Sequence, residues 1–240
     1  MDFPLASAVV PRLIVRDSSP STNTELVALA AAEALAPFTT MLTEDQTAGR
    51  GRLDRSWVAP RGASVAVSVL VPADAGSWIP LVAGLAMADA LTPLLGPRVG
   101  IKWPNDVLVD DAKICGILAE LTPRGVVVGA GLNTAMTAEQ LPVPTATSLH
   151  LAGVAADVDA LVAAYVTALR GHLAATPAEL RTRVAARVST LGRRVRADLP
   201  DGSALSGEAV ALDDEGRLVI ETAGRRRVAV AAGDVVHVRG

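Results

Sequence analysis

The residues best suited to chemistry lie in a loop, Gln46 to Trp57, that holds few apolar side chains. Its core alternates flexible and cationic positions: Gly49, Arg50, Gly51, Arg52 and Arg55. Guanidinium forks match the geometry of phosphate and carboxylate groups, and glycines let backbone N–H groups approach an anion. The spacing therefore predicts an anion site covered by Trp57, with nucleic-acid contact or a merely solvated loop as alternatives. It matches neither a Walker loop nor a dinucleotide fingerprint.

A second segment, Lys102-Trp-Pro-Asn-Asp106, carries one of only two lysines among the 22 basic residues of the chain. The other, Lys113, follows closely in a chain that otherwise uses arginine. The ammonium of lysine is a compact point charge, whereas the guanidinium of arginine is a planar fork. The two lysines therefore indicate a role that arginine would not fill. Lys102 ends a predicted strand before a Pro-Asn-Asp turn, which can point it into a cleft. An ordinary surface lysine is the alternative.

Two further segments are weaker signals when each is taken alone. Ser21-Thr-Asn-Thr24 opens a predicted helix, where hydroxyl and amide groups can cap the helix or meet a polar ligand. Gly129-Ala-Gly-Leu-Asn133 holds two glycines that permit close backbone approach. Cys115 lies in an apolar strand and is predicted to be a buried small hydrophobe, not a nucleophile. We assign no metal-ligating residue.

These segments must be positioned by a mixed set of helices and strands. Helices are predicted at 22–36, 79–95, 157–174 and 177–188, the first with a Thr22–Glu25 capping box. Strands are predicted at 12–15, 40–44, 63–72, 100–103, 107–109, 113–121 and 125–131. The rest of residues 1–20 is expected to be a lead-in, and 45–60 a loop. The pattern predicts a mixed α+β domain over residues 1–188.

The pattern changes after about residue 190. Short strands are predicted at 193–199, 205–212, 217–222, 227–230 and 235–238, separated by turns rich in glycine and aspartate. A run of short strands without a helix predicts a small β-barrel, because closure removes exposed strand edges. We therefore expect a second domain over residues 189–240.

Composition excludes several classes of protein. Half of the 240 residues are hydrophobic and a fifth are charged, which excludes a disordered or fibrous chain. The single cysteine excludes an internal disulfide framework and fits a reducing cytoplasm. A net charge of −3 gives no basic bias toward nucleic acid or anionic lipid. The apolar segment 79–96 contains Asp89 and two prolines, so it predicts a buried helix and not a membrane span.

Taken together and in this order, the segments resemble those of biotin–protein ligases. The family's Ser-Thr-Asn, Gln-x-x-Gly-Arg-Gly-Arg-x-x-Arg-x-Trp, Lys-Trp-Pro-Asn-Asp, Lys-x-x-Gly-Ile-Leu and Gly-x-Gly-x-Asn motifs match residues 21–23, 46–57, 102–106, 113–118 and 129–133. Each motif is modest alone, whereas five in the same order are specific. The resemblance covers nearly the whole chain, because the C-terminal strands are similar to the family's small SH3-like domain.

The resemblance implies a catalytic domain related to class II aminoacyl-tRNA synthetases, with a mixed, largely antiparallel sheet and flanking helices. It implies that the carboxylate of biotin attacks the α-phosphate of MgATP to give biotinyl-5'-adenylate. A lysine of a biotin carboxyl carrier domain would then receive the biotin. ATP, Mg²⁺ and biotin are thus the expected small molecules, and the carrier domain of acyl-CoA carboxylases is the expected partner.

The resemblance also implies a role for individual residues. Lys102 and Arg50 are expected to act in catalysis. Biotin binding is expected from Ser21, Thr22, Asn23, Gln46, Gly49, Arg50, Gly51, Arg52, Trp57, Lys102 and Gly116. ATP binding is expected from Arg52, Arg55, Trp57, Asn105, Lys113 and Asn133. The loop from Gln46 to Trp57, called the arginine loop below, is expected to order over the bound ligand and exclude water from a mixed anhydride.

Two other functions are alternatives to a biotin–protein ligase. A lipoate ligase shares the fold and the adenylation chemistry, and a nucleic-acid-binding module using Arg225–Arg227 is a second alternative. Only twenty residues precede Ser21, too few for the helix-turn-helix domain of some family members, so no repressor role is expected. We expect a cytoplasmic monomer or homodimer without nucleic-acid or membrane partners.

Overall fold

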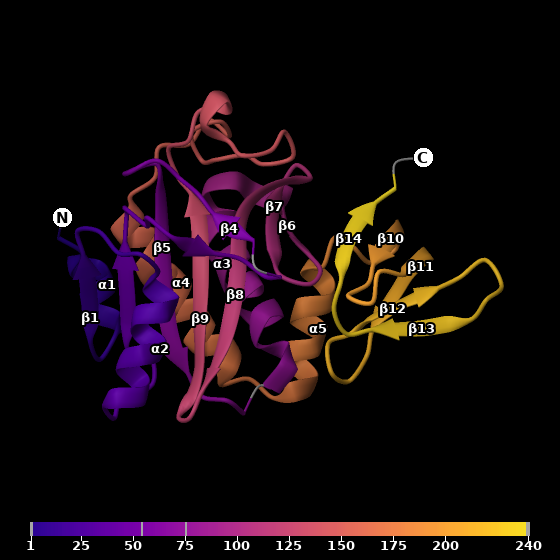
Figure 1. The fold of residues 1–240 in the computed structure, drawn as a ribbon, viewed down its shortest axis with the longest axis horizontal. Coiled ribbons are helices and arrows are strands. Elements are labelled where there is room, and N and C mark those ends of the chain that lie inside the picture. The colour runs from indigo at the N-terminus through magenta and orange to yellow at the C-terminus, as the bar shows by residue number, and fades with distance from the viewer. Residues whose placement is uncertain (1, 54, 75, 239–240) are drawn as a thin grey trace.

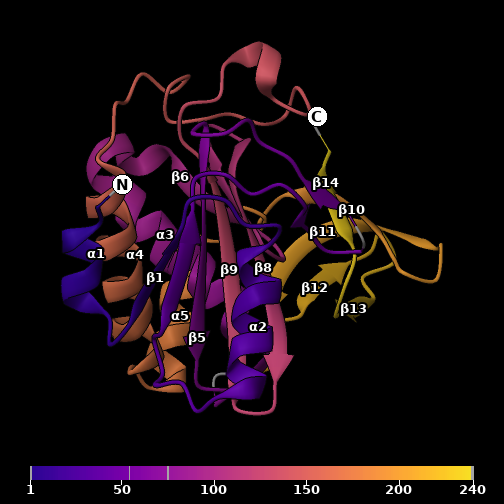
Figure 2. The same ribbon diagram turned by 60° about the vertical axis from the view of Figure 1, so that its left-hand side comes forward.

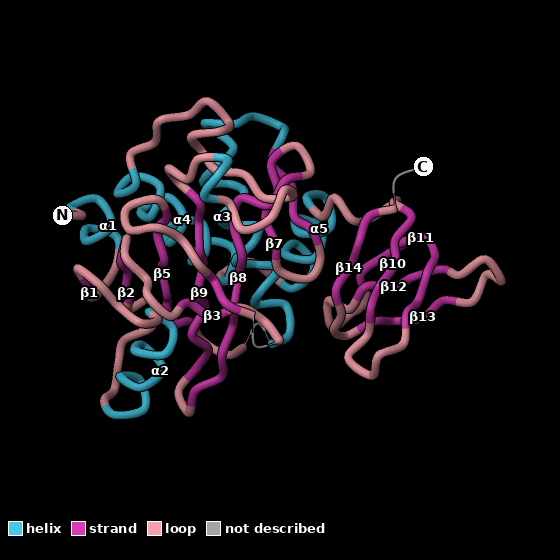
Figure 3. The backbone as a smooth tube through the Cα atoms, turned by 45° about the horizontal axis from the view of Figure 1, so that its top comes forward, coloured by secondary structure: helices cyan, strands magenta, loops and turns pink. Residues whose placement is uncertain are grey.

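The described residues form two large β-sheets and one two-stranded sheet, with helices packed around the largest (Figure 1). The computed structural model describes residues 2–53, 55–74 and 76–238. The larger sheet and its helices come from the chain before Val188, and the smaller sheet from the chain after Arg193. Figure 3 shows the smaller sheet set to one side of the larger. The domain division at residue 188 stays a prediction.

The larger sheet has seven strands in the order β1-β2-β5-β9-β8-β7-β6. They are β1 (Leu13–Arg16), β2 (Thr40–Thr43), β5 (Ser64–Val71), β6 (Val99–Lys102), β7 (Asp106–Val109), β8 (Ala112–Thr122) and β9 (Gly125–Asn133). Among the described strands, β1 and β2 run parallel and every other neighbouring pair in this sheet is antiparallel. The mixed, largely antiparallel sheet with flanking helices is therefore confirmed.

Helices cover both faces of this sheet (Figure 2). On one face, α2 (Thr22–Ala32) packs against β5, β8 and β9. On the other face, α3 (Ile79–Leu95) packs against β6 to β9. Behind it lie α4 (Val158–Leu173), which also contacts α1 (Pro4–Val9), and α5 (Pro177–Arg187).

Strand β5 shows how residue alternation separates the two faces. Val65, Val67 and Val69 belong to the large apolar core that includes α3. Successive side chains point to opposite faces of a strand, so Ala66 and Ser68 face the α2 side. Ala66 and Ser68 are small and leave room on the α2 face, while Leu70 on the same face packs in a second apolar cluster with Leu26. The candidate site lies in that room.

The predicted buried helix is confirmed as α3. Twelve of its 17 residues are buried, and it forms the centre of the apolar core. The wider segment Gly76–Arg98 is long and apolar enough to cross a membrane, but 67% of its window is buried inside the protein. Its hydrophobicity is therefore explained by the core of this domain.

The smaller sheet has five antiparallel strands in the order β13-β12-β11-β10-β14. They are β10 (Arg194–Asp198), β11 (Ala204–Leu212), β12 (Leu218–Glu221), β13 (Arg227–Val230) and β14 (Asp234–His237). Among the described residues no ladder joins β13 to β14, so the barrel is open along that seam. Two tryptophans attach this domain to the larger one: Trp78 and Trp103 donate through their indole N–H groups to Asp214 O and Gly216 O.

Three local predictions are wrong. The lead-in contains α1, which begins at a proline because the first turn of a helix needs no N–H from it. The loop at 45–60 contains two short paired strands, β3 (Gly49–Arg50) and β4 (Ser56–Trp57). Helix α2 ends at Ala32 and not at residue 36, because Glu33 is extended and pairs with Arg12.

The cap of α2 also differs from the prediction. The Ser21 hydroxyl accepts the backbone N–H of Thr24, so the helix is capped one residue earlier than a Thr22–Glu25 box requires. The Glu25 carboxylate instead accepts hydrogen bonds from Arg16 and Ser19. Thr22 is therefore left available for other contacts.

A charged cluster joins the three core helices behind the sheet. Asp89 of α3 accepts a hydrogen bond from His172 Nε2 of α4 at 2.8 Å and one from Arg187 Nη2 of α5 at 3.2 Å. Arg187 Nη2 also donates to the hydroxyl of Thr92 at 3.0 Å. One carboxylate on α3 therefore ties down both α4 and α5.

We expect Asp89→Asn to lower the free energy of unfolding by about 1–2 kcal/mol, because two charge-assisted hydrogen bonds are weakened in a partly exposed site. Urea denaturation measures this loss. Asp17→Asn, at an exposed position, is the control and should change the free energy of unfolding by less than about 0.5 kcal/mol. Equal stability of the two variants would contradict a joining role for Asp89.

Candidate active site

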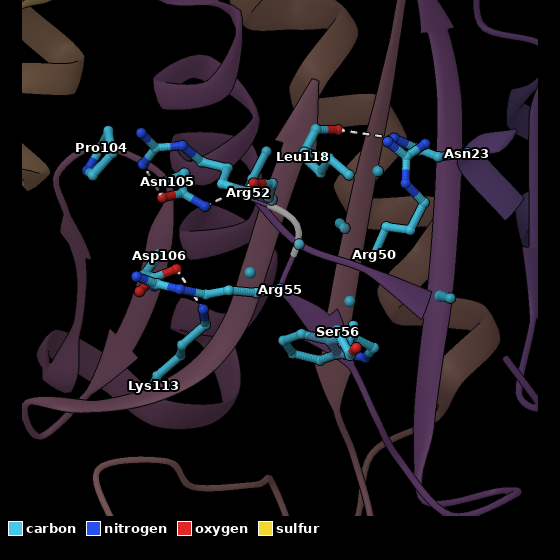
Figure 4. A pocket seen from close by; sticks show the side chains of 18 of the residues that line it. Asn23, Arg50, Arg52, Arg55, Ser56, Pro104, Asn105, Asp106, Lys113 and Leu118 are labelled. Atoms are coloured by element: carbon cyan, nitrogen blue, oxygen red, sulfur yellow. Dashed lines mark hydrogen bonds and ion pairs between the residues drawn. The ribbon is translucent and has the colours of Figure 1, made fainter. Parts of the chain in front are cut away.

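A cavity of about 360 Å³ opens on the α2 side of the sheet and reaches the smaller domain. Figure 4 shows side chains from several elements converging on it. Its lining residues come from the start of α2, the arginine loop, β5 to β9 with the turn after β6, and β14: Ser21, Thr22, Asn23, Gln46, Arg50, Gly51, Arg52, Arg55, Ser56, Trp57, Ala66, Lys102, Trp103, Pro104, Asn105, Asp106, Lys113, Gly116, Ile117, Leu118, Gly129, Ala130, Gly131, Asp234, Val235 and Val236. The volume suits a small organic ligand.

The start of α2 forms one wall of the cavity and is tied to the arginine loop. Thr22 donates its backbone N–H to Gln46 Oε1 at 3.0 Å, and its hydroxyl lies 3.3 Å from the same oxygen. The Ser21 side chain caps the helix beside them. Ser21 and Thr22 are buried and Gln46 is partly exposed, and all three line the cavity, so they can meet the polar part of a ligand.

Ser68 of β5 connects this wall to the sheet. Its hydroxyl lies 2.7 Å from Asn23 Oδ1 and 2.8 Å from the hydroxyl of Thr22. Because an amide oxygen can only accept, Ser68 donates to Asn23 and accepts from Thr22. The Asn23 amide donates to Glu120 Oε2 at 2.9 Å and to Leu118 O at 3.1 Å. A continuous buried network therefore fixes the orientation of Thr22 and Asn23.

Glycines on β8 and β9 clear the floor of the cavity. A Cβ on Gly131 would lie 2.6 Å from Trp57 Cε2, and one on Gly116 would lie 3.1 Å from Trp57 Cζ3. These two glycines are paired across the strands, so the Trp57 indole lies over both. A Cβ on Gly129 would lie 2.3 Å from Asn23 Oδ1. Any larger residue at these positions would displace a side chain of the site.

The three arginines of the loop have different partners. Arg50 Nη1 pairs with Glu120 Oε1 at 2.8 Å at the rim of the cavity, and Arg55 pairs with Asp234 of the smaller domain. Arg52 Nη1 donates to Asn105 Oδ1 at 3.0 Å, and burial lowers the pKa of its guanidinium. Figure 4 shows Arg52 turned toward Asn105 and Arg50 toward the Asn23 side. Arg50 Nη1 also lies 3.5 Å from the hydroxyl of Thr24, whereas Arg52 has no carboxylate partner among the described residues.

Lys102 and Lys113 lie around the carboxylate of Asp106. Lys113 Nζ is 2.7 Å from Asp106 Oδ1 and 5.7 Å from the centroid of the Trp57 ring. The pKa of Lys102 is lowered mainly by burial, and the field of Asp106 opposes that shift while Lys113 and Arg55 add to it. Among the described residues no carboxylate forms an ion pair with Lys102. Of the two lysines near Asp106, Lys113 therefore forms the ion pair and Lys102 does not.

Cationic side chains outnumber acidic ones in the cavity. Five basic residues line it, against the two acidic residues Asp106 and Asp234. Positive charge in a half-buried cavity attracts anions, because the low local dielectric strengthens their interaction. The arrangement can bring two anionic groups together and offset their repulsion.

Most residues expected in the site line this one cavity, but two do not. Gly49 lies outside the cavity lining, and a Cβ there would come within 2.5 Å of Gln46 Nε2 and Trp57 O, so a glycine lets these elements meet. Asn133 is buried at the end of β9 and donates to Thr147 O at 2.9 Å. Cys115 is fully buried and burial raises the pKa of its thiol, so its prediction as an inert hydrophobe is confirmed.

The sequence reasoning missed several residues of the site. Ser68 had a signal, since it is the lone polar residue among valines, leucine and alanine inside β5. Asp106 ends one motif and Glu120 lies two residues after another, but neither was given a role. Asp234 had no signal, because its place beside Arg55 depends on how the two domains dock.

Comparison with known proteins agrees with this geometry. Residues 15–133 match the biotin/lipoate A/B protein ligase family, and residues 190–238 match the biotin protein ligase C-terminal domain. The chain is 42% identical over 232 residues to the biotin--[acetyl-CoA-carboxylase] ligase of Mycobacterium tuberculosis, which covers 91% of this chain and 86% of that one. It is 32% identical over 198 residues to the bifunctional ligase/repressor BirA of Escherichia coli, covering 76% of this chain and 61% of that one.

Solved structures show the same fold. The biotin protein ligase from Aquifex aeolicus in complex with biotin and ATP superposes with a TM-score of 0.79, at 23% identity, over 95% of this chain and 100% of that one. The chain therefore belongs to the biotin/lipoate A/B protein ligase family, and within it to the biotin protein ligases.

The glycine floor leads to a prediction that needs no ligand. We expect Gly131→Ala to move Trp57 out of the cavity, because the new Cβ would lie 2.6 Å from the indole. Acrylamide quenching of tryptophan fluorescence measures this change. For each protein, the signal of its Trp57→Phe counterpart is subtracted to isolate Trp57, which should be more accessible in Gly131→Ala. Gly224→Ala is the control, since nothing lies within 4 Å of a Cβ there. Unchanged quenching of Trp57 in Gly131→Ala would refute the packing described.

Proposed function

We propose that the cavity is the place where this biotin protein ligase performs both steps of its reaction. In the first step the carboxylate of biotin attacks the α-phosphate of ATP, which forms biotinyl-5'-adenylate and releases pyrophosphate. In the second step a lysine amine of a biotin carboxyl carrier domain attacks the carbonyl of the adenylate, which forms the amide and releases AMP. The observation that carries this proposal is the ammonium of Lys102, which has no ion pair among the described residues and lies in a cavity rich in cations.

Lys102 is proposed to act where the two anions meet. The carboxylate and the α-phosphate repel each other, and negative charge on the phosphoryl oxygens must be stabilised as the new bond forms. A preorganised, partly desolvated ammonium stabilises that charge without reorganisation. Lys102 has no ion pair among the described residues, so binding the anions breaks no existing pair at this side chain.

The loop arginines are proposed to hold the phosphates and to cover the intermediate. Arg52 exchanges its neutral partner Asn105 for phosphate more readily than Arg50 or Arg55 exchanges a carboxylate. Arg50, expected as a catalytic residue, is proposed to anchor the loop through Glu120 while it faces the anions. Mg²⁺ bound with ATP would neutralise further phosphate charge, and it takes few protein ligands beside phosphate oxygens.

The network at the start of α2 is proposed to bind the ureido ring of biotin. Ser21, Thr22, Asn23 and Gln46 supply donors and acceptors, and Ser68 fixes the orientation of Thr22 and Asn23. The glycine floor and Trp57 would contact the apolar chain. Gly49, Gly51, Arg52 and Gly116 complete the proposed biotin site. Arg52, Arg55, Trp57, Asn105 and Lys113 are proposed for ATP, and Asn133 is proposed to support that end of the cavity through Thr147.

The partner of the second step is a biotin carboxyl carrier domain, as the activity requires. We propose that residues 1–188 form the catalytic domain and residues 189–240 the C-terminal domain. We propose a cytoplasmic enzyme, monomeric or homodimeric, without nucleic-acid or membrane partners. The net charge of −3 and the single buried cysteine support that proposal. The C-terminal domain match and the ligase relatives favour biotin over lipoate as the substrate.

We expect Lys102→Gln to reduce biotin-dependent pyrophosphate release by about 10²–10³, which is the usual cost of removing one preorganised charge, about 3–4 kcal/mol. Lys102→Arg should rescue only part of this loss, because a planar fork cannot place a point charge between two anions. Initial rates are measured with saturating ATP and either biotin or lipoate. Lipoate should support no release in any of these proteins.

Melting temperatures of the same proteins give the control. Lys102 is partly exposed, so its replacement by glutamine should change folding little. A glutamine variant with unchanged melting and near-normal pyrophosphate release would exclude Lys102 from the chemistry. Pyrophosphate release with lipoate equal to that with biotin would overturn the proposed substrate.

We expect Ser68→Ala to weaken biotin binding by about 5- to 30-fold, equivalent to ~1–2 kcal/mol, because Thr22 and Asn23 lose a buried partner. Titration calorimetry with biotin alone measures the change. Ser64→Ala, on the same strand but away from Thr22 and Asn23, should bind biotin like the unaltered protein. If both variants bind equally well, the network does not orient the biotin site.

A further inference from the structure

The strand that ends in Lys102 is bordered by the segment that links the two domains. Strand β6 is an edge strand of the large sheet, and residues 188–190 run beside it. Ser189 donates its backbone N–H to Ile101 O at 2.8 Å. Trp103 donates its backbone N–H to the hydroxyl of Thr190 at 3.0 Å. The peptide groups on both sides of Lys102 are therefore held by the linking segment.

Thr190 is in turn held by the C-terminal domain. Its side chain is fully buried, and its hydroxyl oxygen lies 3.2 Å from Nε2 of His237, a residue of β14. The three preceding residues of β14, Asp234 to Val236, line the catalytic cavity. His237 thus stands where the last strand of the C-terminal domain, the linking segment and the end of β6 meet.

The protonation of His237 is determined by its second partner. Arg193 Nη1 lies 3.2 Å from His237 Nδ1, and the same guanidinium nitrogen pairs with Asp111 at 2.8 Å. A guanidinium can only donate, so Nδ1 must be the acceptor and the proton of a neutral ring must be on Nε2. His237 Nε2–H therefore donates to the Thr190 oxygen, which also accepts from Trp103. The three groups form one chain of hydrogen bonds.

We propose that His237 is a positioning residue for the reaction, which sets the location of the Lys102 ammonium through Thr190 and the backbone of Trp103. This inference rests on the role proposed above for Lys102. His237 itself need not touch either substrate. It gives the C-terminal domain a direct effect on the adenylation step, in addition to the cavity wall supplied by β14.

The size of the effect follows from the precision that electrostatic catalysis needs. A charge between two reacting anions must be placed to within a fraction of an ångström, and a misplacement of about 1 Å can cost about 10²-fold in rate. Without the His237–Thr190 bond, the Thr190 hydroxyl is free to rotate and the turn after Lys102 loses a fixed acceptor. Substrate binding elsewhere in the cavity would be unaffected. The loss should therefore appear in kcat for adenylation and not in the KM for biotin.

The experiment compares paired variants of the full-length enzyme. His237→Ala and Thr190→Val should each lower kcat for biotin-dependent pyrophosphate release by about 10- to 100-fold, with the KM for biotin unchanged. Thr190→Ser, which keeps the hydroxyl, should restore most of the rate. Val238→Ala, at an exposed position next to His237, should leave the rate unchanged. The two damaging changes combined should be no worse than either alone, because they break the same chain.

A double-mutant cycle with Lys102 separates positioning from general damage. In a Lys102→Gln background, His237→Ala should cause no further loss, because there is no ammonium left to position. If the losses caused by Lys102→Gln and His237→Ala multiply in the double variant, the proposal is overturned. A normal rate for His237→Ala would also overturn it, and so would equal rates for Thr190→Ser and Thr190→Val. If Lys102→Gln alone has a normal rate, the role of Lys102 fails first, and this result is distinct from the others.

The pH dependence of stability gives a second readout that does not need activity. Burial, with Arg193 and Lys102 nearby, lowers the pKa of His237 to about 4, whereas Asp111 opposes that shift. A histidine whose pKa is lowered on folding stabilises the protein above its ordinary pKa of 6.5, and that stability is lost as the pH falls toward 4. The unaltered protein should therefore lose more melting temperature than His237→Gln between pH 6.5 and 4. Identical losses would show that His237 is not held neutral by this site.

Discussion

Five cationic side chains are held in one half-buried cavity before any anion arrives, and their mutual repulsion is the constraint on which the rest of the site depends. Three of them have a carboxylate partner: Arg50 has Glu120, Arg55 has Asp234 and Lys113 has Asp106. Arg52 has only the neutral Asn105, and Lys102 has no ion pair among the described residues. Burial lowers the pKa of both Arg52 and Lys102, the two cations of the cavity without a carboxylate partner among the described residues. The two least compensated cations are those best able to attract a carboxylate and a phosphate.

The sheet makes room for this charge through alternation along its strands. On β5 the valines pack against α3, and the opposite face carries Ala66 and Ser68. On β9 the positions facing α2 include glycines, over which Asn23 and Trp57 lie directly. A large core on one side supplies the burial that supports the fold, so the other side can hold a hydrated, polar cavity. The larger core and the cavity therefore lie on opposite faces of one sheet, and a smaller apolar cluster that includes Leu26 and Leu70 supports the α2 face.

The two domains share the site instead of dividing its work. Strand β14 lines the cavity, Asp234 pairs with the arginine loop, and two tryptophans of the larger domain bond to the turn between β11 and β12. The motifs recognised in the chain all precede residue 134. The contacts at Thr190 and His237 give the smaller domain a place beside Lys102. An enzyme that must exclude water from an adenylate needs such a second wall.

The sequence by itself determined most of the element types, the buried helix α3, the arginine loop and the motifs that supply much of the cavity lining. These features can be recognised because hydrophobic periodicity, the spacing of glycines and the positions of rare lysines depend only on residues that are close together in the sequence. It did not determine the cap at Ser21, the network through Ser68 or the partners of each arginine. It gave no hint of Asp234 or His237. Those depend on contacts between residues far apart in the chain, such as Arg55 with Asp234, whose distance is decided only when the sheet is assembled and the two domains dock.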